Sequence, residues 1–373
     1  MAVGTFLPPS RYTLNNVFKL YNTRKKHQKI ILSSIDQTVQ DISAGKLTKS
    51  STTQGNIQYY RSSINQIKLP VLKIGEQQLV VIKCRLFDPD PENPQPEHCI
   101  ESGTYKNVYI VVLLSTDSTK QRRKPPIYCW ARSMPHNQLQ LDNAVNEIVI
   151  NKKLPRSSES FVDHYGNCHF DGTNGKKRIG ILMEYIPSTL LVKINDGSIA
   201  NMSTEQIAEL LRKLLTMLIA LKTSNIRHGD IKLENTLVDP EIKDIKLCDF
   251  GCSLDITTPG GNRELSGSAQ YVSPEDVYYN RVHYDTLSDM WAMGIIFFMI
   301  CYNRHFIKND HIKLLEKWGE LNTVIDNAFA IFQPNDNAVP FIPLVKKMLT
   351  ILPGLRPSPE ACLRLHNTIV KKL

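Results

Sequence analysis

The sequence lacks the features of a membrane protein, of a secreted disulfide scaffold and of a zinc ribbon. Its longest uncharged apolar run, "WAMGIIFFMICY" at 291–302, is shorter than the roughly 18–20 residues that span a bilayer. No basic region followed by a long apolar stretch opens the chain, so no secretion signal is expected. The eight cysteines form no CxxC pair. A reducing cytoplasm or nucleus is therefore the expected location.

Aromatic residues are missing from the places where the chain is most basic. The formal net charge is +9, and basic side chains gather in "TRKKHQK" (23–29) and "KQRRK" (120–124). Neither cluster has the interleaved aromatic residues of a base-stacking surface, so no clear nucleic-acid site is expected. A solvated face is the simpler interpretation. The alternative is an acidic partner for the basic N-terminal extension.

The first part of the chain shows little hydrophobic periodicity. Residues 1–66 are polar, and "KLPVLKIGEQQLVVIKCRLF" (68–87) then has two apolar runs around a polar turn, the pattern of a β-hairpin. Four prolines within 88–98 interrupt regular structure, because proline removes a backbone donor and fixes φ. We therefore expect an N-terminal extension over 1–95 with a possible hairpin at 68–87.

The rest of the chain changes from strand patterns to helix patterns. Apolar runs at 108–115, 127–133 and 179–186 predict strands, with a helix over 140–154 between the last two. From 203–223 onward helical periods dominate, and Ser203 with Gln206 predicts a capping box at the start of that first long helix. The pattern favours an α+β protein with a small β-rich half before a larger helical half.

Two polar stretches carry a set of residues suited to phosphoryl transfer. "RHGDIKLEN" ends at Asn235, and "DFG" begins at Asp249. Phosphoryl transfer depends mostly on positioning and on electrostatic stabilisation by metal ions and cations. Asn235 and Asp249 offer hard oxygen ligands for Mg²⁺, Asp230 could accept a proton from an attacking hydroxyl, and Lys232 could bind the transferred phosphate.

These motifs occur in a series that resembles the eukaryotic-type protein kinase catalytic domain from about residue 96 to 373. "GSAQYVSPE" is similar to the end of a kinase activation segment, with Ser268 where Ser/Thr kinases keep a hydroxyl between the catalytic Asp and Lys. "SDMWAMG" resembles the start of the central buried helix, where Asp289 would brace the catalytic loop. "LRPSPEACLRLH" resembles the closing motif, so Arg356 should pair with Glu275.

The resemblance implies a bilobal fold and a nucleotide site. Residues 96–186 would form the kinase N-lobe and hinge, and 187–373 the C-lobe. ATP and Mg²⁺ would be the cofactors. Met183 looks like the gatekeeper, and the backbones of Glu184 and Ile186 would bond the adenine base.

The phosphate loop departs from the family pattern G-x-G-x-x-G-x-V. The corresponding stretch is "ESGTYKNV", which keeps only Gly103 of the three glycines together with the apolar Val108. Lys106 stands at the third glycine. On the strand that should read V-A-I-K there is "YCWA" followed by Arg132, so the usual lysine is missing.

The with-no-lysine kinases show a similar arrangement, in which the lysine comes from the phosphate loop. Lys106 would then contact the phosphates, Ala131 would fill the vacated position, and Glu147 on the following helix would be the partner carboxylate. Arg132 is the rival phosphate ligand, and a third alternative is that neither residue takes this role. A one-residue shift of the strand reverses its side-chain faces, so Ala131 and Arg132 cannot both point into one cleft.

Regulation and acceptor also follow from the resemblance. Gly229 replaces the arginine that in many kinases binds a phosphate on the activation segment, so activation through Thr257, Thr258 or Ser266 is not expected. Lys232 and Ser268 match the Ser/Thr-specific pattern. An ATP-dependent protein Ser/Thr kinase acting on protein hydroxyls is the expected function. The alternative is a pseudokinase that serves as a nucleotide-binding or protein-binding scaffold.

Overall fold

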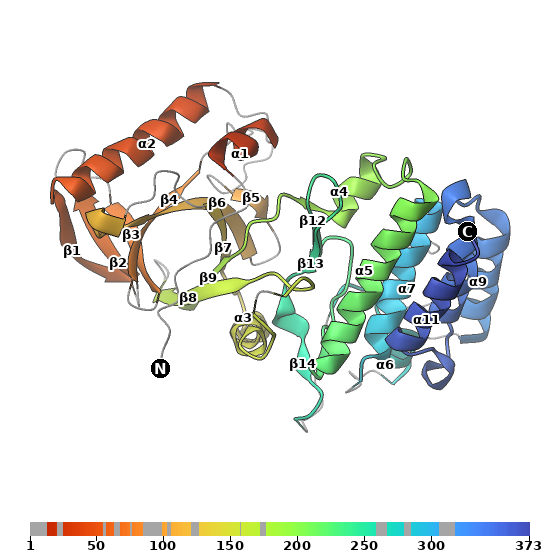
Figure 1. Cartoon of the computed structure of the whole chain (residues 1–373). Helices are drawn as coiled ribbons and strands as arrows, with labels where there is room; N and C mark the ends of the chain where they lie inside the picture. The colour runs from red at the N-terminus through yellow and green to blue at the C-terminus, as the bar shows by residue number, and fades with distance from the viewer. Residues whose placement is uncertain are drawn as a thin grey trace. The chain divides into compact units, whose positions relative to one another are not determined.

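A computed structural model shows the chain as two compact units, residues 1–148 with 163–185 and residues 149–162 with 186–373 (Figure 1). The structure describes residues 13–20, 25–54, 57–62, 68–74, 77–84, 99–102, 106–120, 127–156, 158–171, 177–258, 267–279, 285–305 and 318–373. In this described part of the chain, no helix is long and apolar enough to cross a membrane.

Over its described residues, the first unit is built on one antiparallel sheet of nine strands. Its main path runs β1-β2-β3-β4-β6-β7-β9-β8, and β5 also pairs with β6. Strands β4 and β5 therefore share one edge of β6, with β4 opposite residues 111–115 and β5 opposite residues 107–109. The strands are β1 (Leu47–Gln54), β2 (Ile57–Ser62), β3 (Lys68–Ile74), β4 (Gln77–Lys83), β5 (Cys99–Ser102), β6 (Lys106–Ser115), β7 (Ile127–Ser133), β8 (His164–Asp171) and β9 (Lys177–Met183).

This sheet curls until its two ends approach each other. Cα atoms of β8 lie within 8 Å of Cα atoms of β2 and β3, although these strands are at opposite ends of the main path. One apolar cluster joins residues from β3, β4, β6, β7, β8 and β9, and it includes the buried Val81, Val111 and Trp130. The strands of the N-terminal extension thus close over the same sheet face that β6 and β7 present.

In the described part of this unit, three α-helices accompany the sheet. They are α1 (Leu14–Leu20), α2 (Lys25–Ser43) and α3 (Gln138–Asn151). Helix α2 buries Ile31, Ile35 and Ile42 on one stripe, and it leaves Ile30 and Leu32 exposed. The described residues among the first 66, where the sequence pattern indicated little regular structure, thus contain the helices α1 and α2 and the strands β1 and β2. The stretch expected to form a hairpin contains β3 and β4, which pair antiparallel.

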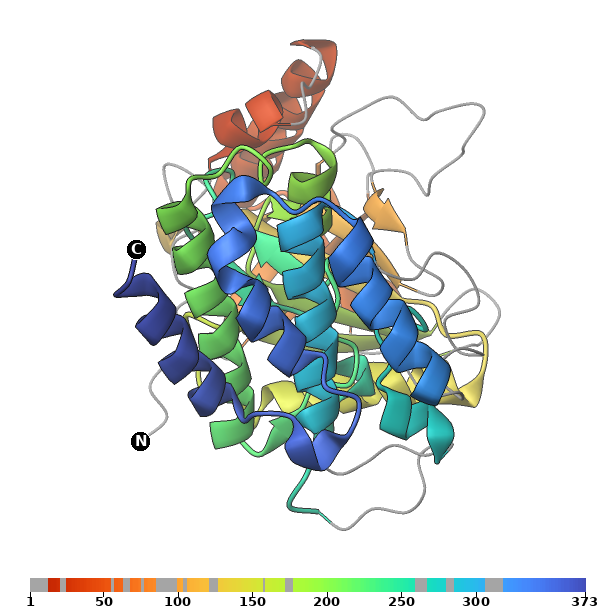
Figure 2. The same cartoon turned by 90° about the vertical axis from the view of Figure 1, so that its right-hand side faces the viewer.

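The second unit is mainly helical and is centred on one helix that is almost entirely buried. In Figure 2 the light-blue α7 lies between the green α5 and the blue α9. Fourteen of the sixteen residues of α7 are buried, including Trp291 and Phe298, and Phe298 meets Phe329 of α9 at 5.2 Å between ring centroids. The helices are α4 (Leu190–Asn195), α5 (Thr204–Thr223), α6 (Pro274–Tyr278), α7 (Leu287–Tyr302), α9 (Trp318–Ile331), α10 (Ile342–Met348) and α11 (Pro359–Val370).

Short strand pairs shape the polar loops of this unit. Strand β12 pairs with β10 and β13, and β11 pairs with β14. These strands are β10 (Ser188–Thr189), β11 (Ile226–Arg227), β12 (Thr236–Val238), β13 (Ile245–Leu247) and β14 (Leu254–Asp255). The capping box predicted for Ser203 and Gln206 is confirmed at the start of α5. A β-rich first unit and a helical second unit agree with the expected α+β class.

Candidate active site

The loop between β11 and β12, residues 228–235, is fixed through its backbone. We call it the polar loop. The carboxylate of Asp289, in the first turn of α7, accepts the N–H of His228 at 2.7 Å and the N–H of Gly229 at 3.0 Å. Asp289 is buried, and charge-assisted bonds of this kind are stronger than neutral ones. The bracing role expected of Asp289 is therefore confirmed.

The ring of His228 holds the polar loop against the stretch that follows β13. It packs on Phe250 with 4.8 Å between ring centroids, and its Nε2 lies 3.1 Å from the carbonyl oxygen of Cys248. The hydroxyl of Ser253 donates to the carbonyl of His228 at 2.8 Å. These contacts place the polar loop beside the Asp-Phe-Gly motif.

Asp230 is the centre of a compact hydrogen-bonded cluster. Its Oδ2 accepts from the ammonium of Lys232 at 2.8 Å and from the side-chain amide of Asn235 at 3.0 Å. Its Oδ1 accepts from the backbone N–H of Ser268 at 2.8 Å. Lys232 also donates to the Ser268 hydroxyl at 2.7 Å. The structure thus brings together four predicted residues, with Ser268 meeting Asp230 through its backbone and Lys232 through its hydroxyl.

The charge of Lys232 is set by its neighbours. Burial disfavours the ammonium, but the carboxylates of Asp230, Glu234 and Asp249 outweigh burial and raise the pKa of Lys232 above its ordinary value. The lysine is therefore a cation throughout the physiological pH range. It stands next to a carboxylate and a hydroxyl, on the side of the polar loop that faces residues 267–273.

The orientation of Asn235 follows from its partners. Its side-chain nitrogen donates to two oxygens of Asp230, the carbonyl at 2.8 Å and Oδ2 at 3.0 Å. Because both partners accept hydrogen bonds, the amide nitrogen must face them and the amide oxygen must point elsewhere. The backbone carbonyl of Asn235 accepts the N–H of Cys248 at 3.0 Å, so Asp249 is the next residue along that strand end.

Asp249 itself has an unusual backbone. Its φ of 65° lies in the left-handed region, which non-glycine residues adopt rarely and mostly where surrounding structure enforces it. Asp249 lies shortly after the end of β13 and directly before the turn at Phe250–Cys252. The two predicted metal ligands, Asn235 and Asp249, therefore lie at the neighbouring ends of paired strands.

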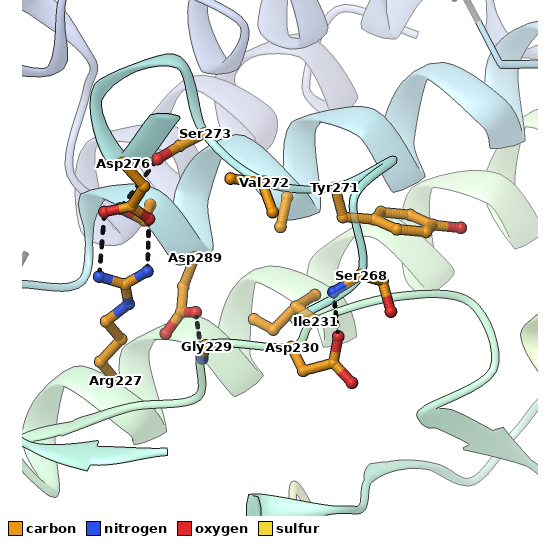
Figure 3. A pocket seen from close by; sticks show the side chains of 12 residues that line it. Arg227, Gly229, Asp230, Ile231, Ser268, Tyr271, Val272, Ser273, Asp276 and Asp289 are labelled. Atoms are coloured by element: carbon orange, nitrogen blue, oxygen red, sulfur yellow. Dashed lines mark hydrogen bonds and ion pairs between the residues drawn. The ribbon is translucent and has the colours of Figure 1, made fainter. Parts of the chain in front are cut away.

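A pocket lies between the polar loop, residues 267–273 and the first turns of α6 and α7 (Figure 3). We call residues 267–273 the return segment. The buried Glu275 of α6, which lies between the pocket-lining residues Ser273 and Asp276, is bound by Arg356 through two contacts of 2.7 and 3.0 Å. The predicted pairing of Arg356 with Glu275 is confirmed, and it anchors the end of the return segment.

The first unit holds a second ion pair. The ammonium of Lys106, the first residue of β6, lies 2.8 Å from Oε2 of Glu147 on α3. The lysine side chain is 14% exposed and the glutamate 1%, so the pair is largely removed from water. The structure thus brings Lys106 to the helix carboxylate that the sequence suggested as its partner.

Arg132 lies on the opposite face of the sheet from Lys106. In the register of β6 and β7, Val108 faces Ala131 and Asn107 faces Arg132. Side chains alternate between the two faces of a strand, so Lys106 shares a face with Val108 and Ala131. Arg132 shares the other face with Trp130, a member of the closed apolar cluster. Lys106 and Arg132 therefore do not converge.

Other predicted residues are placed as follows. Gly103 and Ser266 lie outside the described residues. Met183 ends β9 and is buried. The N–H of Glu184 donates to the carbonyl of Asp163 at 2.9 Å, and Ile186 begins the longer stretch of the second unit. Thr257, in contrast, donates its hydroxyl to Asp255 at 2.6 Å within its own turn, and Thr258 follows it.

Sequence reasoning missed a buried ion pair beside the polar loop. The guanidinium of Arg227 binds the carboxylate of Asp276 at 2.5 and 3.3 Å, and both side chains are buried. The only signal in the sequence is that each residue directly adjoins a motif, Arg227 before His228 and Asp276 after Glu275.

Comparisons with known proteins agree with this arrangement. The chain is 32% identical over 248 residues to Actin-regulating kinase 1 of Saccharomyces cerevisiae, covering 62% of this chain and 36% of that protein. It is 26% identical over 219 residues to a protein kinase domain-containing protein of Schizosaccharomyces pombe, covering 54% of this chain and 32% of that protein. The match to Serine/threonine-protein kinase 17A of Oryctolagus cuniculus is 27% over 188 residues, 46% of this chain and 44% of that one. The chain thus spans less than half the length of these relatives.

A solved structure supports the fold. A chain from the structure of the CAK complex of Chaetomium thermophilum bound to ATP-gamma-S aligns with a TM-score of 0.53 at 18% identity, covering 71% of this chain and 88% of that chain. The bilobal kinase fold, with a β-rich N-lobe and a helical C-lobe, is therefore confirmed. The family model of the protein kinase domain matches residues 119–366, more than half of the sequence, and the chain belongs to the protein kinase domain family.

Proposed function

We propose that this chain is an active, ATP-dependent and Mg²⁺-dependent serine/threonine protein kinase. The observation that carries the proposal is the cluster around Asp230. Lys232, Asn235 and Ser268 each donate a hydrogen bond to the Asp230 carboxylate within 3.0 Å, and Lys232 also donates to the Ser268 hydroxyl. A scaffold that only binds a partner does not need these four groups in this geometry.

Each member of the cluster has a chemical task in the proposed reaction. Asp230 would accept the proton of a serine or threonine hydroxyl as that oxygen attacks the γ-phosphorus and the bond to the nucleoside diphosphate breaks. Lys232, held as a cation, would bind the oxygens of the transferred group. Ser268 would keep Lys232 and Asp230 at a fixed separation through its hydroxyl and its backbone N–H.

The donor set fits a hard divalent cation. The amide oxygen of Asn235 points away from Asp230, and Asp249 supplies a carboxylate at the end of the adjoining strand. Mg²⁺ is typically held by one or two protein oxygens together with substrate phosphates and water. When bound, Mg²⁺ would neutralise charge on the phosphates. The task of this chain is to hold Asn235 and Asp249 in place, which the bond between Asn235 and Cys248 achieves.

Contacts to the nucleotide are assigned to the first unit and the segment that follows it. Lys106, oriented by Glu147, is the proposed phosphate ligand, because Arg132 lies on the other sheet face. Because the N–H of Glu184 already donates to Asp163, the contact of Glu184 with the base would be made by its carbonyl oxygen. The backbone of Ile186 would supply the second contact.

The test is transfer of labelled phosphate from ATP to a generic basic protein in the presence of Mg²⁺. Asp249→Ala should abolish transfer. Asp230→Asn should lower kcat by roughly two to four orders of magnitude, the range for loss of a general base, while ATP binding persists. Asp326→Asn, an exposed carboxylate of α9, is the matched control and should keep full activity.

The outcomes separate the two candidate functions. Turnover in the unmutated chain that disappears in Asp249→Ala supports a kinase. Tight ATP binding without turnover would favour the scaffold instead. Normal turnover in Asp230→Asn would overturn the role given to this carboxylate.

A further inference from the structure

The Arg227–Asp276 pair is a two-pronged contact buried inside the second unit. Two guanidinium nitrogens reach two carboxylate oxygens, Nη2 to Oδ2 at 2.5 Å and Nη1 to Oδ1 at 3.3 Å. The residues are 3% and 1% exposed. A paired guanidinium and carboxylate fix both distance and orientation, because the two planar groups must align.

This pair closes a circuit of contacts around the reactive carboxylate. Arg227 ends β11 and directly precedes the polar loop. Asp276 lies in the first turn of α6, directly after the return segment. The other end of the return segment, at Ser268, donates to Asp230 in the polar loop. The return segment is thus held from both sides, at Ser268 by the polar loop itself and beyond Ser273 by the Arg227–Asp276 pair, as Figure 3 shows.

Gly267 lets the return segment lie close to the polar loop, and Gly229 lets the polar loop lie close to the turn that contains Cys252. A Cβ built on Gly267, which has a φ of 110°, would lie 2.6 Å from the carbonyl oxygen of Gly229. A Cβ built on Gly229, which has a φ of 77°, would lie 2.7 Å from the carbonyl oxygen of Cys252. Real Cβ atoms essentially never approach backbone oxygens so closely, so a larger residue at position 229 would need the backbone to shift.

Gly229 and the Arg227–Asp276 pair both bear on how the return segment is held against the polar loop. Gly229 stands where many kinases have an arginine that binds a phosphate on the activation segment, and it has no side chain with which to do so. Arg227, two residues earlier, reaches a permanent carboxylate in α6 in place of an added phosphate. A carboxylate built into the sequence needs no modifying enzyme.

We propose that the Arg227–Asp276 pair positions the return segment on the polar loop in the unphosphorylated protein. It thereby replaces the contact between arginine and phosphate that Gly229 cannot make. Arg227 and Asp276 act as positioning residues, since neither touches the reacting atoms. The inference rests on the proposed kinase function, and it specifies how that activity becomes independent of phosphorylation.

The energetics of buried ion pairs suggest how to separate positioning from stability. Removal of one partner leaves an unpaired buried charge and destabilises the fold strongly, whereas apolar replacement of both partners is often neutral or stabilising. The variants are therefore Arg227→Met, Asp276→Leu and the two combined, with Arg227→Lys as the conservative change. Arg212→Met is the matched control, because Arg212 makes the same two-pronged contact with Glu209 on the exposed surface of α5.

Three quantities are measured on the full chain after phosphatase treatment, namely the melting temperature, kcat with a protein substrate, and hydrogen exchange of residues 267–279. Both single variants should have a lower melting temperature than the unmutated chain and a kcat that is at least tenfold lower. The double variant should regain its melting temperature while kcat stays at least tenfold low and exchange at 267–279 stays at least tenfold fast. Arg227→Lys should fold normally with intermediate values, and Arg212→Met should match the unmutated chain.

Several results would overturn the proposal. One is normal kcat together with normal hydrogen exchange in the double variant. Another is normal hydrogen exchange in Arg227→Lys and in both single variants. A third is loss of activity when the unmutated chain is treated with phosphatase. If the unmutated chain has no turnover at all, the proposed kinase function fails by itself. The exchange measurement then still decides whether the ion pair holds the return segment.

Discussion

Lys106 and Arg132 show how a single strand register assigns a cation to one side of a sheet. Both residues are basic and both lie close to the position where the family keeps its lysine. The pairing of Asn107 with Arg132 turns the arginine toward the apolar cluster. The pairing of Val108 with Ala131 places small side chains on the opposite face, beside Lys106. Glu147 then meets Lys106 at 2.8 Å. Lys106 is therefore the cation that can be exchanged for a strand lysine.

The first prediction concerns this exchange. Lys106→Ala should lower kcat/KM by tenfold or more, since a hydrogen bond to a charged group contributes about 1.5–3 kcal/mol. Arg132→Ala should be much milder. The double variant Lys106→Gly with Ala131→Lys should recover part of the activity that Lys106→Gly loses, because position 131 shares the face of Lys106. Full activity of Lys106→Gly together with an inactive Arg132→Ala would reverse the assignment.

The second prediction uses two glycines with nearly equal backbone angles. Gly229 has a φ of 77° and Gly197 a φ of 79°, but a Cβ on Gly197 would meet nothing closer than 3.9 Å. Gly197→Ala should therefore cost only the strain of a left-handed residue, about 1–2 kcal/mol. Gly229→Ala adds the contact with Cys252 and should cost clearly more. Urea unfolding measures both, and equal losses would show that the Cys252 carbonyl moves aside freely.

Local signals in the sequence predicted the bounds of some helices and strands well. Ser203 and Gln206 predicted the start of α5, because capping residues act through their own backbone neighbours. The strand expected at 127–133 has the same bounds as β7. Helix α2 was missed, since the exposed Ile30 and Leu32 flank the buried Ile31 and obscure the helical stripe.

Contacts between distant elements were predictable only where a known motif supplied the partner. Glu275 and Arg356 are 81 residues apart, and the family resemblance named them as a pair. Arg227 and Asp276 are 49 residues apart, and no pattern in the sequence connects them. The sequence therefore described much of the cluster around Asp230 but not the buried pair that attaches α6 to it.

The third prediction concerns the contact of α5 with α11. Lys222, in the last turn of α5, donates to both carboxylate oxygens of Glu360, in the first turn of α11, at 2.8 and 2.9 Å. The hydrogen bond from Lys222 lowers the pKa of Glu360 to about 2, below its ordinary 4.5. A depressed folded-state pKa stabilises the fold above the unfolded pKa, and this stability is lost as pH falls through the folded pKa.

A double-mutant cycle with Lys222→Met and Glu360→Gln measures the contribution. At pH 7 the coupling energy should be below about 1 kcal/mol, because both side chains are partly exposed to solvent. Between pH 4.5 and pH 2 it should shrink toward zero. A coupling that stays constant over this pH range would mean that the carboxylate is not the group that carries it.

At the scale of the whole molecule, the N-terminal strands belong to the same sheet as the strands of the kinase domain. The family match begins at residue 119, yet β4 pairs with β6 along residues 79–83, and β8 lies near β2 and β3. The apolar cluster of the curled sheet takes Leu72, Leu79 and Val81 from the N-terminal strands. Without those strands the aromatic residues of β6 and β7 would face water.

The last prediction follows from this closure. A chain shortened to residues 99–373 should expose Tyr109, Trp130 and their apolar neighbours, bind a hydrophobic dye and aggregate, because contiguous apolar patches of this kind promote association. In the full-length chain Val81→Asp should have a similar effect, since it places a carboxylate among apolar side chains that are at most 5% exposed. That penalty of several kcal/mol is large against a total stability of about 5–15 kcal/mol.

Lys73→Asp is the matched control for this substitution. Lys73 lies on the neighbouring β3 with an exposed side chain, so the same carboxylate there remains in water. The free energy of unfolding should therefore change by less than about 0.5 kcal/mol. Dye binding and urea unfolding of the three proteins provide the comparison. If residues 99–373 unfold cooperatively at the same urea concentration as the full chain, the N-terminal strands contribute nothing to the core of the sheet. If residues 99–373 do not unfold in this way, and Val81→Asp does not fold while Lys73→Asp does, residues 47–83 form an essential part of the N-lobe sheet.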